Sequence, residues 1–215
     1  MLEAIIKGRN QAGSSSVELL GIESASVPEE KREARAATVL PAEVGLWALL
    51  ATITMLFAGF SSAYLVRRAA PDWVPIYCPP VLWVSTALLV LSSVALEVAK
   101  TRRRMNRAGA VRSWLLAGVG LGLAFLAGQF FAWNQLSARG IFLPTSPHSS
   151  FFYMLTGVHA AHVLGGIGGL FYALFRRWSP ATRPGSADPV ALCATYWHFV
   201  TGVWIYLFGL LFIWR

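Results

Sequence analysis

Long runs without a charged side chain dominate the hydrophobic pattern of this chain. Five such runs lack Asp, Glu, Lys and Arg altogether: residues 44–66, 76–96, 113–138, 149–175 and 190–214. Each has at least the ~20 residues that an α-helix needs to cross a hydrocarbon core about 30 Å thick. A strand of a membrane β-barrel would need only ~10 alternating residues. The pattern therefore predicts five transmembrane helices, over about 44–66, 76–98, 113–138, 149–175 and 190–214.

Residues 1–40 have a different composition from the rest of the chain. They are polar, mix acidic with basic side chains and include a small-residue patch at 13–16. They lack the continuous apolar stretch of a secretory signal. We expect a partly disordered polar arm, followed by a five-helix membrane domain over 41–215.

Composition supports a membrane protein. Charged residues make up 13% of the 215 residues and hydrophobic ones 56%, whereas soluble domains carry about a quarter charged residues. This excludes a soluble globule, a fibrous protein, a disulfide scaffold and a disordered chain. The two cysteines, Cys78 and Cys193, fall at opposite ends of different predicted spans, too far apart for a disulfide. The predicted fold class is all-α, a polytopic five-helix bundle.

The distribution of basic residues predicts the orientation. With five spans, 14 of the 18 Lys and Arg residues fall on the side of the N-terminus, and only Arg67, Arg68, Arg139 and Arg215 fall on the other. The positive-inside bias then places the N-terminus in the cytoplasm and the C-terminus in the periplasm. The net charge of +8 therefore indicates anionic lipid rather than nucleic acid. The predicted head-group contacts are Arg102, Arg103, Arg104, Arg176 and Arg177.

Three spans carry small and polar residues at helical spacing. Small residues on one stripe let helix backbones approach, and Gln or His there can bond to the neighbouring helix. We expect these stripes to face other helices. They are Gly118, Gly122, Phe125, Gln129 and Trp133 in the third span, His159, His162, Gly166 and Gly169 in the fourth, and His198, Gly202, Ile205 and Gly209 in the fifth.

Few polar residues in the spans are candidates for chemistry, and an intramembrane ionisable group is a functional hypothesis by default. They are Glu97, Gln129, His159, His162, His198 and, at the edge of a span, His148. A rise of 1.5 Å per residue places His162 and His198 at nearly the same depth, roughly 16 and 18 Å from the outer face. We expect these two to reach each other or a shared polar partner. His159 should lie near the level of Gln129, and Glu97 should pair with an Arg or His of a neighbouring helix.

These histidines allow two interpretations, a haem or metal site and a structural role between helices. His162 and His198 at matched depth would permit one bis-His haem b. A di-haem protein needs four such ligands, however, and no carboxylate or thiol stands near His159 and His162 to complete a metal site. The favoured interpretation is neutral histidines bonded to another helix or to water. No run contains a carboxylate for a proton relay, and no repeated halves suggest a transporter. No catalytic, cofactor-binding or metal residue is predicted in this chain.

Two histidine-bearing segments resemble one family. Residues 195–208, TYWHFVTGVWIYLF, are similar to the last helix of subunit III of the haem–copper oxidases, and residues 151–163, FFYMLTGVHAAHV, to the helix before it. Weaker similarities cover Gly45–Ala58, Leu91–Glu97 and the third-span residues Phe125, Gln129 and Trp133. The resemblance extends over about 42–214, in the five-helix form of the family.

The resemblance implies a non-catalytic partner in aerobic respiration. Such subunits bind no haem or copper, which belong to partner chains. They flank the catalytic subunit I, with subunit II in the same complex, hold phospholipid between helices and support proton uptake in a bacterial inner membrane. The expected interhelical residues are Glu97, Gln129, His159, His162, Trp197, His198 and Trp204.

Two departures from the family limit what can be transferred. Many members carry a carboxylate where this chain has Ile53, and some carry an acid where it has Ala132, so any role of those acids is absent here. Alternatives left open are an accessory subunit of a nitric-oxide reductase, a quinol-oxidase third subunit and a bis-His haem electron-transfer protein. The electron donor, cytochrome c or quinol, also stays open.

Overall fold

The computed structural model describes residues 40–71, 73, 77, 79–105, 107–175 and 188–213. These form five long helices: α3 (Leu40–Arg68), α4 (Val81–Arg104), α5 (Ala108–Ala138), α6 (Pro147–Phe175) and α7 (Pro189–Phe208), which a π-helical turn, η1 (Gly209–Ile213), extends. All five are long and apolar enough to cross a membrane. The predicted all-α fold with five spans is confirmed. The arm 1–39 and the pair Arg176 and Arg177 lie outside the described residues.

Local signals fix where the helices begin and end. α4 begins at Val81 rather than at 76, after two prolines, and continues through the basic cluster to Arg104. α5 ends in a Schellman motif, in which Gly140 (φ 76°) follows the last turn and Ile141 N–H donates to the Leu136 carbonyl at 3.0 Å. Asp188 caps α7 by accepting from Val190 N–H at 3.1 Å, ahead of Pro189 in the first turn.

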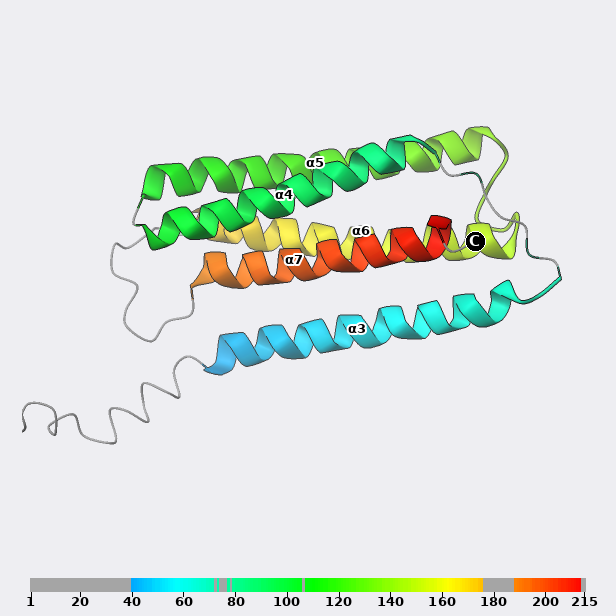
Figure 1. The fold of residues 1–215 in the computed structure, drawn as a ribbon, viewed down its shortest axis with the longest axis horizontal. Helices are drawn as coiled ribbons and strands as arrows, with labels where there is room; N and C mark the ends of the chain where they lie inside the picture. Colours follow the sequence, from blue (N-terminus) through cyan, green and yellow to red (C-terminus); the bar gives the residue numbers. More distant parts are fainter. Residues whose placement is uncertain are drawn as a thin grey trace, which may run out of the picture. The chain divides into compact units, whose positions relative to one another are not determined.

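Four of the helices form a closed bundle. Consecutive helices run in opposite directions (Figure 1). α4 packs on α5 and α7, and α6 packs on the same two helices, so that each of the four has two neighbours. The ends of α4 and α7 where Arg104 and Asp188 lie define what we call the basic end of the bundle.

One tryptophan occupies the middle of this bundle. Trp197 of α7 is fully buried. A Cβ added at Gly122 of α5 would stand 2.8 Å from its ring, and one at Gly166 of α6 would stand 3.1 Å from it. Only glycine lets both backbones approach the indole this closely. The stripes in the third and fourth spans therefore do face neighbouring helices, as their spacing predicts.

The stripe predicted in the fifth span does not face a neighbouring helix, and this prediction is wrong. Gly202 and Ile205 are exposed, and nothing lies within 4 Å of a Cβ built at Gly202. The buried side of α7 is formed instead by Trp197, Val200, Thr201 and Trp204. Large apolar side chains recur at helical spacing on this side too. The spacing of the glycines taken alone therefore predicts the outward side of α7 instead of the buried one.

α3 is attached differently from the other helices. It has no such close backbone pairing with another described helix. Its side-chain contacts include aromatic pairs: Phe57 lies 5.7 Å from the His162 ring, and Tyr64 lies 5.7 Å from Phe151 and 5.9 Å from His148, centroid to centroid. Side chains rather than backbones therefore hold α3 to α6.

Candidate functional site

A polar cluster joins α4 and α7 toward the basic end. His198 of α7 contacts the Ser93 hydroxyl through Nδ1 and the Glu97 carboxylate through Nε2, the latter at 3.1 Å. Lys100 donates to both Glu97 oxygens at 3.1 Å. A neutral imidazole has one donor and one acceptor, so His198 can donate to Glu97 and accept from Ser93. Glu97 thus pairs with a histidine of a neighbouring helix.

The structure does not join His162 to His198, contrary to expectation. His162 Nδ1 donates to the Val158 carbonyl of its own helix at 2.8 Å. The α7 residue that reaches His162 is Tyr196, whose hydroxyl donates to the His162 carbonyl at 3.0 Å. Residues two apart on a helix point about 200° apart. Because Tyr196 faces α6, His198 faces the opposite way, toward α4.

His159 and Gln129 lie inside the bundle. Both are buried, and neither has a hydrogen-bond partner for its side-chain nitrogens and oxygens within the described chain. The His159 ring is surrounded by Trp204 at 5.0 Å and Phe125 at 5.8 Å, between ring centroids. Gln129 lies one turn beyond Phe125 on α5. Aromatic packing of this kind holds the imidazole in position without a hydrogen bond.

The two tryptophans of α7 have different roles: Trp197 packs between helices, and Trp204 forms a hydrogen bond to another helix. Trp197 fills the space between Gly122 and Gly166, and Trp204 Nε1 donates to Thr86 Oγ1 of α4 at 2.9 Å. Thr86 in turn donates to the Leu82 carbonyl at 2.7 Å. Sequence reasoning missed Thr86 and Ser93 because hydroxyl residues in a span can bond to their own helix, which leaves no sign of an interhelical partner.

Three of the predicted head-group arginines, Arg102, Arg103 and Arg104, lie at the basic end, and Arg103 makes an interhelical contact. Arg103 Nε donates to Asp188 Oδ1 at 3.0 Å, which ties the end of α4 to the start of α7. The partly buried Arg102 and the exposed Arg104 are its neighbours. The sequence contained a usable signal for Asp188, since an acid before a proline is typical of a helix start.

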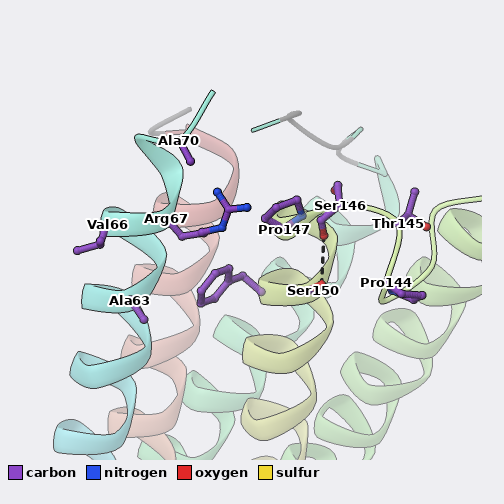
Figure 2. A pocket seen from close by; sticks show the side chains of 10 residues that line it. Ala63, Val66, Arg67, Ala70, Pro144, Thr145, Ser146, Pro147 and Ser150 are labelled. Atoms are coloured by element: carbon purple, nitrogen blue, oxygen red, sulfur yellow. Dashed lines mark hydrogen bonds between the residues drawn. The ribbon is translucent and has the colours of Figure 1, made fainter. Parts of the chain in front are cut away.

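A pocket of about 870 Å³ lies at the other end of the helices. Figure 2 shows Arg67 extending from α3 toward Pro147 at the start of α6. Ala63, Val66 and Phe151 form apolar walls, and Thr145, Ser146 and Ser150 add hydroxyl groups. The pocket therefore combines a cation and hydroxyls with an apolar interior, and it is open at its mouth.

His148 belongs to an aromatic group near this pocket. It is buried and stacks on Trp73, with 4.8 Å between ring centroids and 18° between planes. Tyr64 of α3 packs edge-on against Trp73 at 5.1 Å. Within the described part of the chain, no group of three or more His, Cys, Asp or Glu side chains is placed to hold a metal ion. The histidines observed are engaged in helix packing.

These features define a polytopic helical membrane protein whose intramembrane polar groups lie mainly at contacts between helices. A family model described as cytochrome c oxidase subunit III matches residues 43–215, which include all five spans. The chain belongs to this family.

Named relatives agree with the family match. A protein of Mycobacterium bovis named "Probable cytochrome c oxidase subunit 3" is 31% identical over 180 residues, covering 80% of this chain and 87% of its own length. The cytochrome c oxidase subunit 3 of Thermostichus vulcanus is 31% identical over 179 residues, with 79% and 86% covered. That of Alkalihalophilus pseudofirmus is 29% identical over 175 residues, with 79% and 85% covered.

Membership confirms the predicted resemblance and implies a complex with other oxidase subunits. Ile53 is buried and belongs to the apolar core. An apolar side chain therefore occupies this position, and Ile53 cannot take part in chemistry that requires an acid.

Proposed function

We propose that this chain is the non-catalytic subunit III of an aerobic respiratory haem–copper oxidase, bound to catalytic subunit I with subunit II in the same complex. The oxidase reduces oxygen to water and pumps protons, and this subunit supports assembly and sustained proton uptake. The observation that carries the proposal is the family match across 43–215. The polar groups support it, since Glu97, His198 and Trp204 serve contacts between helices.

The haem and copper of this oxidase would reside in the partner subunits. His198, one half of the bis-His alternative, has both ring nitrogens bonded to α4, and His162 uses Nδ1 on its own helix. These bonds do not favour haem ligation by the pair. The matches likewise do not favour a nitric-oxide reductase accessory subunit.

Purification through a tag on this chain, in mild detergent, tests the proposal. We expect subunits I and II to co-purify, with oxidase haem and copper in the complex and none in the separated chain. Co-purification of nitric-oxide reductase subunits would overturn it. So would a b-type Soret band in the isolated chain that disappears in the His198→Phe variant.

We further propose that phospholipid binds along this subunit. Arg102 and Arg104 at the basic end suit phosphate groups, and the pocket beside Arg67 has apolar walls for an acyl chain. Lipid extraction from the complex followed by mass spectrometry should find retained phospholipid. Complete delipidation should lower subunit retention and turnover, and unchanged retention and turnover would contradict this role.

The complex would reside in a bacterial inner membrane with the N-terminus in the cytoplasm. The asymmetry of the 18 Lys and Arg residues supports this. Fusing a reporter that is active only in the periplasm to each terminus tests the orientation. Activity of the C-terminal fusion alone is expected, and activity of the N-terminal fusion would reverse the topology.

A further inference from the structure

The polar cluster of α4 and α7 faces outward from the bundle. The Glu97 side chain is 49% exposed and that of His198 is 39% exposed. Glu97 lies seven residues before Arg104, about 10 Å along the helix from the basic end. Of the carboxylates in the described residues, Glu97 alone lies away from a helix terminus. Exposing such a group to lipid is costly, so these residues are rare on lipid-facing surfaces.

Apolar residues continue the surface around this cluster. On α4, exposed positions recur every three or four residues and lead from Glu97 to Val94 and Leu91. On α7, Gly202 and Ile205 lie one and two turns beyond His198 and are exposed. The bond between Glu97 and His198 brings the two stripes together. We call this surface the α4–α7 face: Leu91, Val94, Glu97, His198, Gly202 and Ile205.

The cluster is fixed in position and has capacity for a further donor. Both His198 nitrogens are engaged, so the ring is held in one orientation. Glu97 Oε2 accepts from Lys100 and His198, whereas Oε1 accepts from Lys100 only. A carboxylate offers about four acceptor sites. Lys100 already balances the negative charge of Glu97. A partner group at this surface must therefore donate a hydrogen bond, but it need not carry a positive charge.

On the other outward surfaces that the structure describes, no carboxylate is exposed away from a helix terminus. The outward residues of α5 include Leu116, Leu123 and Phe130, and α3 exposes Met55. Lipid tails cover such side chains at no cost, since they are equally apolar. The α4–α7 face is therefore the surface that gains most from a protein cover.

We propose that the α4–α7 face docks a transmembrane helix of another oxidase subunit, and that this helix places a hydrogen-bond-donating side chain against Glu97. The inference rests on the proposed function, which supplies the partner. The donor completes the Glu97 carboxylate, and the apolar residues of the face pack against the rest of the helix.

Site-directed crosslinking in the assembled complex tests the location of the contact. Cys78 and Cys193 are replaced by Ala, and a single cysteine is introduced by Val94→Cys or, as the matched control, Leu116→Cys. Val94 is 55% exposed and Leu116 48%. They lie about 15 and 12 Å from the basic ends of their helices. Each cysteine then carries a maleimide photo-crosslinker in native membranes.

We expect an adduct with an oxidase subunit from Val94→Cys and at least a severalfold weaker one from Leu116→Cys. Equal adducts, or an adduct from the α5 position alone, would overturn the proposal. If no oxidase subunit co-purifies with the tagged chain, the proposed function itself has failed. If an oxidase subunit co-purifies but Val94→Cys gives no adduct, the proposed docking at the α4–α7 face is wrong and the proposed function stands.

Substitution of Glu97 tests the donor. Intramembrane hydrogen bonds average about 0.6 kcal/mol with a ceiling near 1.7, which corresponds to about 3- to 20-fold in an equilibrium constant. Glu97→Leu should release the subunit from the detergent-washed complex more readily by that factor. Glu97→Gln, which keeps an acceptor oxygen, should restore part of the retention. Glu43→Leu, at the exposed start of α3, should have no effect.

Unchanged retention in Glu97→Leu, or an equal loss in Glu43→Leu, would contradict the assigned donor contact. If the Glu97→Leu chain does not accumulate, the crosslinking comparison decides, since it keeps Glu97 in place.

Discussion

α3 and the α4–α7 bundle are both apolar and both span the membrane, yet they are held together by different means. Within the bundle, glycines admit neighbouring side chains, and hydrogen bonds join helices, as between Ser92 and the Gly118 carbonyl at 2.8 Å. Along residues 42–66 of α3, the described side-chain hydrogen bonds are those of Thr52 and Thr54 to their own helix. Gly45 and Gly59 face open space. The two glycines of α3 therefore do not serve packing within the described chain.

The difference illustrates what stabilises helices in lipid. Moving an apolar side chain from lipid to protein gains little, because both surroundings are apolar, so association depends on close packing and polar bonds. α4–α7 have both kinds of contact. α3 relies on side-chain contacts, namely the apolar contacts of Ile53 and the aromatic contacts of Phe57 and Tyr64. We therefore expect the bundle to be the stable unit and α3 to depend more on its surroundings in the complex.

The largest predicted effect is on the bundle centre. Trp197→Ala removes the ring that lies between α5 and α6, and a core substitution of this size costs about 3–5 kcal/mol. Trp47→Ala, on the exposed surface of α3, should change stability by about 0.5 kcal/mol or less. Thermal unfolding in mild detergent, followed by size-exclusion chromatography, compares them. Similar losses in both variants would remove the distinction between the two regions.

Adding a methyl group should likewise destabilise the bundle more than it destabilises α3. Gly122→Ala places a methyl group 2.8 Å from rigid ring atoms of Trp197, and overpacking of this kind costs about 1–3 kcal/mol. Gly59→Ala meets no atom within 4 Å and should be neutral or slightly stabilising. The same melting assay applies. A destabilised Gly59→Ala would show that α3 packs more tightly than its contacts indicate.

Loss of Phe57 should loosen α3 without unfolding the bundle. Phe57→Ala removes ring contacts with His159 and His162, each worth about 0.5–1.5 kcal/mol. A single cysteine at Ser61, which is buried one turn away, reports the change through its rate of maleimide labelling. We expect severalfold faster labelling than with Met55→Ala, an exposed neighbour on α3. Equal rates would mean that Phe57 does not hold α3 in place.

The smallest effect is expected from one interhelical hydrogen bond. A double-mutant cycle with Trp204→Phe and Thr86→Val isolates the bond between α7 and α4. The coupling should be about 0.6 kcal/mol and no more than about 1.7. The cycle cancels the loss of the local Thr86 bond to Leu82. A coupling indistinguishable from zero would assign the stability of the bundle to packing alone.

The sequence by itself determined the number of spans and two of the packing seams. Hydrophobic run length does this because backbone groups in lipid must bond within a helix or a closed barrel, and apolar runs of more than 20 residues exceed the ~10 alternating residues of a barrel strand. The spacing of Gly118 and Gly122, and of His159 and Gly166, also selected the buried sides of α5 and α6. Short motifs at residues 151–163 and 195–208 identified the family, since they hold rare residue types at fixed separations.

Only the tertiary structure decided how each helix is rotated about its axis and which partners its polar groups meet. The depth estimated from the sequence puts His162 and His198 at one level. Each residue turns the helix by about 100°, however, so Tyr196 and His198, two residues apart, lie on opposite sides of α7. Bulky Trp197 and Trp204 turned inward, which directed His198 to Ser93 and Glu97. Rotation depends on the fit of all four helices at once. That fit is a property of three-dimensional packing, and spacing along one helix does not contain it.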